Sequence, residues 1–169
     1  VKDGQVGSIN RASSAGFGIR VIADGAWGFA SSPKIDKAEI ERVAKLAVKV
    51  AKASARLKIR DLELAPVEKY VDKYVTPHKK NPLEVPLEEK IALLLKTDEI
   101  MRKVKGVNIT ESRIAAWVED QLFASTIGSV IEQRIVQCGG GYTATAIKDG
   151  DVQYRSYPCS HGGQWESNG

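Results

Sequence analysis

The sequence is poor in the residues that build most metal centres and disulfide scaffolds. Its 169 residues include two cysteines, Cys138 and Cys159, and two histidines. A structural zinc site needs about four converging ligands, so Cys159 and His161 fit a packing role better than a metal site. A single disulfide between the two cysteines is the alternative to two reduced thiols, which are typical of cytosolic proteins. We expect reduced thiols, one in a strand and one in a loop, in a cytoplasmic protein with no metal or cofactor site in this chain.

Long apolar runs are also missing. No stretch approaches the roughly 20 consecutive apolar residues that a membrane-spanning helix requires, and no basic-then-apolar leader opens the chain. The missing apolar run argues against a membrane protein, whereas the missing leader says little in a chain whose start we expect to be absent. The chain begins at Val1 rather than at methionine and ends over 167–169 without a finished element. We therefore expect both ends to be cut from a longer protein.

The sequence shows no combination of residues that is typical of a catalytic site. His78 lies in a lysine-rich segment that we predict to be an exposed loop, so it offers no Ser-His-Asp arrangement. Cys159 and His161 are too close in sequence to act as nucleophile and base. Paired carboxylates at 88–89 and 119–120 fit a helix start and a turn. We predict no catalytic residue in this chain.

Positive charge is concentrated in one segment. The chain is 43% hydrophobic, which is enough for a core, and its net charge is +4. The segment 34–60 carries nine bases: Lys34, Lys37, Arg42, Lys45, Lys49, Lys52, Arg56, Lys58 and Arg60. We interpret them as the solvated face of a helix; the alternative is a surface for phosphates or an acidic partner. No aromatic residues interleave them to stack on nucleobases, so we do not expect nucleic-acid binding.

The segment 16–32 predicts two short strands joined by a tight turn. Apolar residues alternate along 16–23, and Asp24-Gly25 suits a type I′ turn, which needs positive φ at both central residues. Trp27 and Phe29 then alternate with glycine and alanine on the return strand. We expect both rings to pack in the core beneath the helix that follows.

That helix has clear start signals. Asp36 is placed to cap it, and Glu39 three residues later completes a capping box. An apolar stripe follows at helical spacing. Its members are Ile40, Val43, Ala44, Ala47, Val50 and Ala51. The stripe requires burial, and we expect the neighbouring hairpin to cover it.

The next part of the chain has the character of a connection. Prolines interrupt the segment 61–86, within which one short helical turn over 67–75 fits the tyrosine spacing. Pro86 suits the first turn of a second helix, which Gly106 ends. The predicted domains are a sheet-plus-helix unit at 1–60, a linker at 61–86 and a second unit at 87–169.

Strand-like sequence fills the rest of the chain. The predicted strands are 107–118, 122–137 (bent or divided in two), 141–147 and 152–157, with a hairpin turn at Asp149-Gly150. Successive strands joined by short turns form an antiparallel meander. The predicted fold class is α+β: a small antiparallel sheet with one long helix, then a second helix followed by an antiparallel β-meander.

The run Gly139, Gly140 and Gly141 can be read in two ways. A glycine-rich loop cradles phosphate when it follows a strand and opens a helix, but strand-like residues follow here and no Gly-Lys-Ser/Thr occurs. We predict instead a bulge or bend within the sheet. Such a bend would leave a strand edge open to a peptide backbone.

The segment 16–32 also carries a family resemblance. It is similar to the TldD/PmbA signature GxGxRVxxDGxWGFAS. The matching residues are Gly16, Gly18, Arg20, Val21, Asp24, Gly25, Trp27, Gly28, Phe29, Ala30 and Ser31. A second match has Arg155-Ser156-Tyr157-Pro158 followed by Gly162-Gly163. The TldD/PmbA family, also labelled a modulator of DNA gyrase, contains large cytosolic dimeric proteins. Some are zinc-dependent peptidases with a His-Glu-x-x-x-His helix, a motif that this chain lacks.

The resemblance implies that this chain is the N-terminal and central part of a TldD-like zinc metallopeptidase that acts on peptides or unfolded proteins. It also implies that the zinc is bound beyond residue 169 and that the full-length protein is a homo- or heterodimer. One alternative is the corresponding part of a non-catalytic PmbA-like partner. Another is a nucleic-acid or gyrase-associated module acting through the basic helix. The substrate-binding candidates are Arg155, Tyr157, His161, Gly162 and Gly163. This segment either lines the substrate cleft or packs against the catalytic half.

Overall fold

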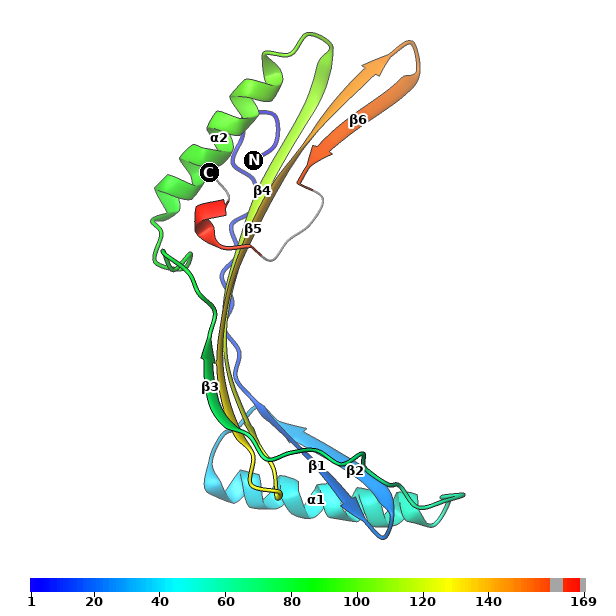
Figure 1. Ribbon diagram of the computed structural model, residues 1–169. Coiled ribbons are helices and arrows are strands. Elements are labelled where there is room, and N and C mark those ends of the chain that lie inside the picture. Colours follow the sequence, from blue (N-terminus) through cyan, green and yellow to red (C-terminus); the bar gives the residue numbers. More distant parts are fainter. Residues whose placement is uncertain (159–162, 168–169) are drawn as a thin grey trace. The chain divides into compact units, whose positions relative to one another are not determined.

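The computed structural model describes residues 1–158 and 163–167, which form two compact units (Figure 1). One unit is Asn10–Glu68, and the other combines Val1–Ile9 with Lys69–Gly169. The predicted α+β fold class, with its small sheet and helix followed by a second helix and antiparallel strands, is confirmed. No helix within the described ranges is long and apolar enough to cross a bilayer.

The unit Asn10–Glu68 is a two-stranded antiparallel sheet with a helix on one face. Its elements are β1 (Phe17–Ala23), β2 (Ala26–Ser32) and α1 (Lys37–Ala55). The strands pair from Ala23↔Ala26 next to the turn. Asp24 and Gly25 have φ values of 51° and 72°, so the predicted two-residue turn with positive φ is confirmed.

The predicted cap of α1 is confirmed. Asp36 has an extended backbone, and its carboxylate accepts a hydrogen bond from the Glu39 backbone N–H at 2.9 Å. The two oxygens of the Glu39 carboxylate accept from the Arg42 guanidinium at 2.8 and 2.7 Å. The hydrogen bonds from Arg42, and then one from Ser32, lower the pKa of Glu39 to about 2.

Small residues allow α1 to lie close to the sheet. Val43, Ala47 and Ala51 are fully buried on the helix, whereas Ile40 of the predicted stripe remains 40% exposed. A Cβ atom added at Gly28 of β2 would overlap the Ala47 carbonyl oxygen and Ala51. Glycine is therefore required for this approach of helix and strand.

The prediction that Trp27 and Phe29 pack beneath this helix is wrong. Ala26 and Ala30 are buried beside Gly28 on the α1 side of β2. Because side chains alternate along a strand, the two rings lie on the opposite face, where Trp27 is 41% and Phe29 53% exposed. The small side chains of β2 face the helix because only they permit so short a distance between α1 and β2.

The second unit is built on two long strands. Its elements are β3 (Val71–Val75), α2 (Leu87–Arg102), β4 (Val107–Ala124), β5 (Val130–Lys148), β6 (Asp151–Tyr157) and the 3₁₀ helix η1 (Trp165–Ser167). β4 pairs with one edge of β5, and β3 and β6 pair with the two ends of its other edge. β4, β5 and β6 form the predicted antiparallel meander, whereas β3 runs parallel to β5.

Several boundaries differ from the predicted ones. The segment 67–75 contains β3 rather than a helical turn, because its backbone pairs with 130–134 of β5. The predicted turn at 119–120 lies inside β4. The chain instead reverses after Ser125, whose N–H donates to the Ser129 carbonyl at 3.0 Å.

The glycine run does not interrupt β5. The residues 139–141 pair with 113–115 of β4 in the register of their neighbours, so the predicted bulge is wrong. The long continuous partner strand holds these glycines extended. The turn at Asp149-Gly150 is confirmed, with φ values of 52° and 84°.

A buried polar cluster attaches α2 to β4. Asp98 is 2% exposed, and its carboxylate accepts a hydrogen bond from the Thr110 hydroxyl at 2.5 Å. The Thr110 backbone N–H donates to the Asp3 carboxylate at 2.8 Å, while the Asp3 N–H donates to the Thr110 carbonyl at 3.0 Å. Residues 1–5 thereby border β4, on the edge that β5 leaves free.

Candidate functional site

The candidate site is a cleft beside the glycine run. It has a volume of about 430 Å³ and is bounded by α2, β4, β5, the end of β6 and η1. Apolar side chains of Leu93, Leu94 and Ile114 line it together with Thr97 and Ser112. The cleft has the size of a small-molecule binding site, and apolar and polar groups share its lining about equally.

β5 forms a wall of the cleft in which Gly140 has no side chain. On the α2 side of the sheet, Gly140 lies between Cys138, which is fully buried, and Tyr142. The Gly163 carbonyl accepts a hydrogen bond from the Cys138 N–H at 2.8 Å and closes one end of the cleft. The main chain of β5 is therefore accessible from the cleft without an intervening side chain.

The predicted binding residues are only partly brought together. Tyr157 and Gly163 line the cleft, and the Tyr157 ring centroid lies 6.1 Å from that of Tyr142. Arg155 is exposed on β6, where its guanidinium donates to the Tyr154 carbonyl at 2.8 Å, and it is not a lining residue. His161 and Gly162 lie outside the described residues.

The contribution of α2 to the cleft was not predicted from the sequence. Leu93, Leu94 and Thr97 form one wall, and Thr97 donates its hydroxyl hydrogen bond to the Leu93 carbonyl at 2.9 Å. An apolar residue such as Leu94 on a helix is a signal for packing, and the sequence of α2 gave none for a cleft. The register of β4 and β5, which brings Ile114 opposite Gly140, was not readable from the sequence.

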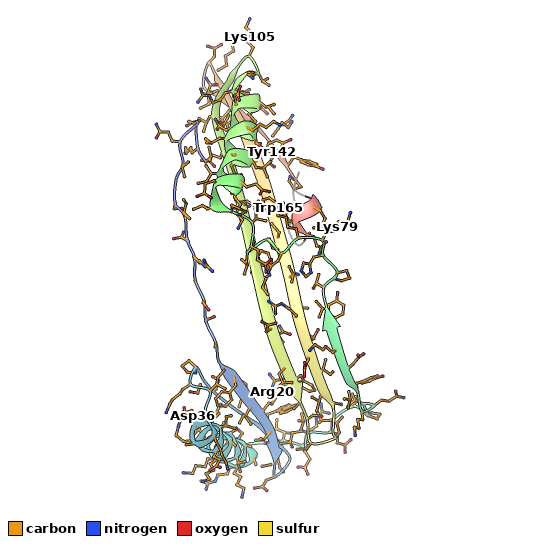
Figure 2. The ribbon with its side chains drawn as sticks, turned by 90° about the vertical axis from the view of Figure 1, so that its left-hand side faces the viewer. Arg20, Asp36, Lys79, Lys105, Tyr142 and Trp165 are labelled. Carbon is orange, nitrogen blue, oxygen red and sulfur yellow. The ribbon has the colours of Figure 1, made fainter. Side chains whose placement is uncertain are left out.

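The loop before α2 is joined to η1 at the side of the cleft. The Lys79 backbone N–H donates to the Glu166 carboxylate at 2.9 Å, and this hydrogen bond lowers the pKa of Glu166. Lys80 forms an ion pair with Glu89 at 2.9 Å, with its ammonium 5.7 Å from the Trp165 ring centroid. Figure 2 shows Lys79 and Trp165 close together. These contacts position Gly163 against β5.

The described residues do not provide a metal centre. No group of three histidine, cysteine, aspartate or glutamate side chains is close enough to hold an ion within 1–158 and 163–167. His78, predicted to be exposed, is half-buried, and its Nδ1 lies 2.7 Å from the Thr76 carbonyl oxygen. Cys159 lies outside the described residues, so the two reduced thiols stay a prediction. The cleft offers binding surfaces rather than reactive groups.

Comparison with known families finds two models of one family that match this chain. The family model described as "PmbA/TldA metallopeptidase domain 1" matches residues 1–51, and the "PmbA/TldA metallopeptidase central domain" matches residues 80–167, half of the chain. The chain belongs to the PmbA/TldD family. The cleft lies within the central-domain match, and the β1–β2 hairpin lies within the domain 1 match.

Individual relatives agree with this assignment. A metalloprotease of Methanocaldococcus jannaschii is 29% identical over 91% of this chain, and one of Methanothermobacter thermautotrophicus is 26% identical over 98%. The chain spans 34% and 35% of the lengths of these two relatives. The crystal structure of a candidate modulator of a DNA gyrase from Thermotoga maritima has the same fold. It matches with a TM-score of 0.63 and 17% identity over 92% of this chain and 34% of that one.

Proposed function

We propose that this chain is the N-terminal and central part of a zinc-dependent, TldD-like metallopeptidase of the cytoplasm that acts on peptides or unfolded proteins. The observation that carries the proposal is the central-domain match over residues 80–167. The relatives named metalloproteases, about three times as long as this chain, support it. The described residues do not fit a zinc site. The proposal therefore assigns the metal, the His-Glu-x-x-x-His motif and the cleavage chemistry to sequence beyond residue 169.

Within this function, the cleft beside Gly140 contacts the substrate. Its accessible β5 main chain suits hydrogen bonding to an extended peptide, and Leu93, Leu94 and Ile114 suit apolar substrate side chains. A polypeptide without fixed structure offers both features irrespective of its sequence. The protein then works as a homo- or heterodimer whose subunit contacts lie in the remaining part.

A non-catalytic PmbA-like partner subunit is the alternative, because both branches share the two domains matched here. A binding module for nucleic acid is a second alternative, supported by the exposed bases Lys45, Lys49 and Lys52 on α1. Duplex binding that weakens steeply with salt and disappears in the K45Q/K49Q/K52Q variant would favour this second alternative.

The test is the zinc content of this chain and of a polypeptide extended beyond Gly169, each followed by a peptide-cleavage assay with and without a chelator. We expect about one zinc per chain and chelator-sensitive cleavage in the extended polypeptide, and neither in residues 1–169. An extended polypeptide that holds no zinc and cleaves nothing would overturn the peptidase proposal and favour the non-catalytic branch. Zinc bound by residues 1–169 alone would contradict the assignment of the metal to the remaining part.

A further inference from the structure

The face of the β1–β2 sheet that α1 leaves uncovered has an unusual composition. Alternation places Arg20 and Ile22 of β1 and Trp27 and Phe29 of β2 on this face. Ile22 is 37%, Trp27 41% and Phe29 53% exposed. Two aromatic residues, one isoleucine and one arginine therefore share a small solvent-facing surface. Arginine and aromatic residues are the types most enriched at the energetic centres of protein interfaces.

Arg20 is held in place on this surface. Its guanidinium carbon lies 5.5 Å from the Trp27 ring centroid and 5.8 Å from the Phe29 ring centroid. The Phe29 ring extends over Gly18, where a Cβ atom would come within 2.8 Å of it. Within the part of the chain that the structure describes, no ion pair joins a carboxylate to Arg20. The stacked guanidinium thus offers planar donors in a fixed orientation to an outside acceptor.

The neighbouring strand edge is also open. Ala23 and Ala26 form the hydrogen-bonded pair that closes the two-residue turn. The alternation of an antiparallel ladder then directs the backbone groups of Trp27, Phe29 and Ser31 away from β1. The sheet consists of β1 and β2 alone in the described ranges. The residues that present the two rings therefore also present unpaired main-chain groups along β2.

Charge decides between possible occupants of this face. Arg20 is its one charged residue, and the bases of α1 belong to the helix on the other face of the sheet. A nucleic acid would need several cations along one track, which this face does not supply. A second copy of the same face would bring arginine toward arginine with no carboxylate between them. A partner that carries a carboxylate between apolar side chains complements the face.

We propose that the Arg20–Trp27–Phe29 face is a docking surface for an extended segment of another protein in which every second residue is, in turn, apolar, acidic and apolar. The segment adds beside β2 through main-chain hydrogen bonds, as in β-strand addition. Alternate side chains of the segment then point to the same face of the sheet. One of them brings a carboxylate to the Arg20 guanidinium, and its neighbours cover Trp27 and Phe29.

The experiment measures fluorescence anisotropy of a labelled ten-residue peptide with leucine, glutamate and leucine at three successive alternate positions and threonine elsewhere, and of the analogue with glutamine in place of the glutamate. We expect the glutamate peptide to bind the 169-residue chain at least about tenfold more tightly than the glutamine analogue, because a charged hydrogen bond is lost. Arg20→Gln and Phe29→Ser should each weaken binding of the glutamate peptide about tenfold. Lys49→Gln, which removes the same charge from the solvent side of α1, should leave binding unchanged, and Arg20→Lys should restore it in part.

Hydrogen exchange of α1 establishes that each variant is folded. Equal binding of the two peptides, or an Arg20→Gln variant indistinguishable from Lys49→Gln, would overturn the proposal. So would tighter, Arg20-dependent binding of a ten-nucleotide oligothymidine, which would assign the face to single-stranded nucleic acid. A dimer in sedimentation that Phe29→Ser abolishes would assign the face to a second copy of the chain.

Discussion

Both units of this protein pack a helix over a strand that contains glycine, and the two strands use glycine in opposite ways. At β2, Gly28 lets the backbone of α1 come so close that no Cβ atom fits between them. At β5, Gly140 lies under α2, and the space that its missing side chain leaves is part of a cleft of about 430 Å³. The same absence of a side chain therefore closes one interface and opens the other.

The attachment of the helices explains this difference. α1 is held by buried apolar residues along its length, namely Val43, Ala47 and Ala51. α2 is attached by the buried hydrogen bond between Asp98 and Thr110 and by the Ser112 hydroxyl, which donates to the Leu94 carbonyl at 3.3 Å. The cleft opens beside the middle of the helix, at Leu93, Leu94 and Thr97. Continuous apolar contact fills the space beneath a helix, whereas attachment by a few polar contacts leaves room for a ligand.

The largest expected effect comes from adding a side chain where the helix and strand touch. Gly28→Val should destabilise the unit Asn10–Glu68 by about 3 kcal/mol or more, because the buried contact cannot expand without displacing α1. Hydrogen exchange measured by mass spectrometry should show α1 exchanging much faster while β4 is unchanged. Gly7→Val is the matched control, since nothing lies within 4 Å of the added Cβ position. Slow exchange of α1 in Gly28→Val would contradict the close-contact role.

Removal of the polar attachment of α2 should have the next largest effect. Asp98→Ala leaves the buried Thr110 hydroxyl with only the Asp3 carboxylate, at 3.4 Å, as an acceptor, which should cost about 2 kcal/mol in the free energy of unfolding. Urea denaturation measures the loss, and exposed Glu99→Ala serves as the control. Thr110→Val should reproduce most of the effect of Asp98→Ala. A double variant much less stable than either single one would show that the two residues do not act through this hydrogen bond.

The corresponding substitution in the cleft should impair binding rather than folding. Gly140 lines the cleft, so the isopropyl group of Gly140→Val should occupy part of it. We expect a small change in stability and a loss of peptide affinity of about tenfold, equivalent to about 1.4 kcal/mol. A labelled neutral peptide of alanine and leucine measures the affinity by anisotropy, again with Gly7→Val as control. Unchanged affinity in a folded Gly140→Val variant would contradict the proposal that the cleft contacts the substrate.

The smallest expected effect concerns the start of α1. The pKa of Glu39 is lowered from its ordinary 4.5 to about 2 by the hydrogen bonds from Arg42 and then Ser32. A carboxylate with a lowered folded-state pKa stabilises the fold above its unfolded-state pKa, and this contribution is lost as the pH falls toward the folded-state value. Thermal unfolding between pH 4.5 and 2 should therefore show a steeper loss of stability for the wild type than for Glu39→Gln. Identical pH profiles would contradict the pairing.

Local signals in the sequence predicted local structure well. The turn at Asp24-Gly25 needs only residues that tolerate positive φ, and the Asp36 cap needs only an acceptor three residues before an N–H. The side of β2 that faces α1 was harder to assign, since large aromatic residues alternate there with small ones. The small ones are buried because Ala47 and Ala51 of the helix leave no space for rings.

Non-local pairing accounts for what the sequence could not reveal. β3 is a strand because it meets β5 about sixty residues further along the chain, and the segment 139–141 stays extended because β4 pairs with it throughout. The cleft likewise depends on the register of two strands and the position of a helix. Of the predicted binding residues, Tyr157 and Gly163 line it because β6 and η1 end there.

The hydrogen bonds between residues 1–5 and the strand β4 determine the order in which parts of the protein can fold during synthesis. The Ser112 N–H donates to the Val1 carbonyl at 2.8 Å, across more than a hundred intervening residues. At about 5–20 residues per second of synthesis, the first segment waits on the order of 5–20 seconds for its partner. The unit Asn10–Glu68 lies wholly within that interval. The unit Asn10–Glu68 can therefore fold during synthesis before β4, the strand that residues 1–5 border, has been made.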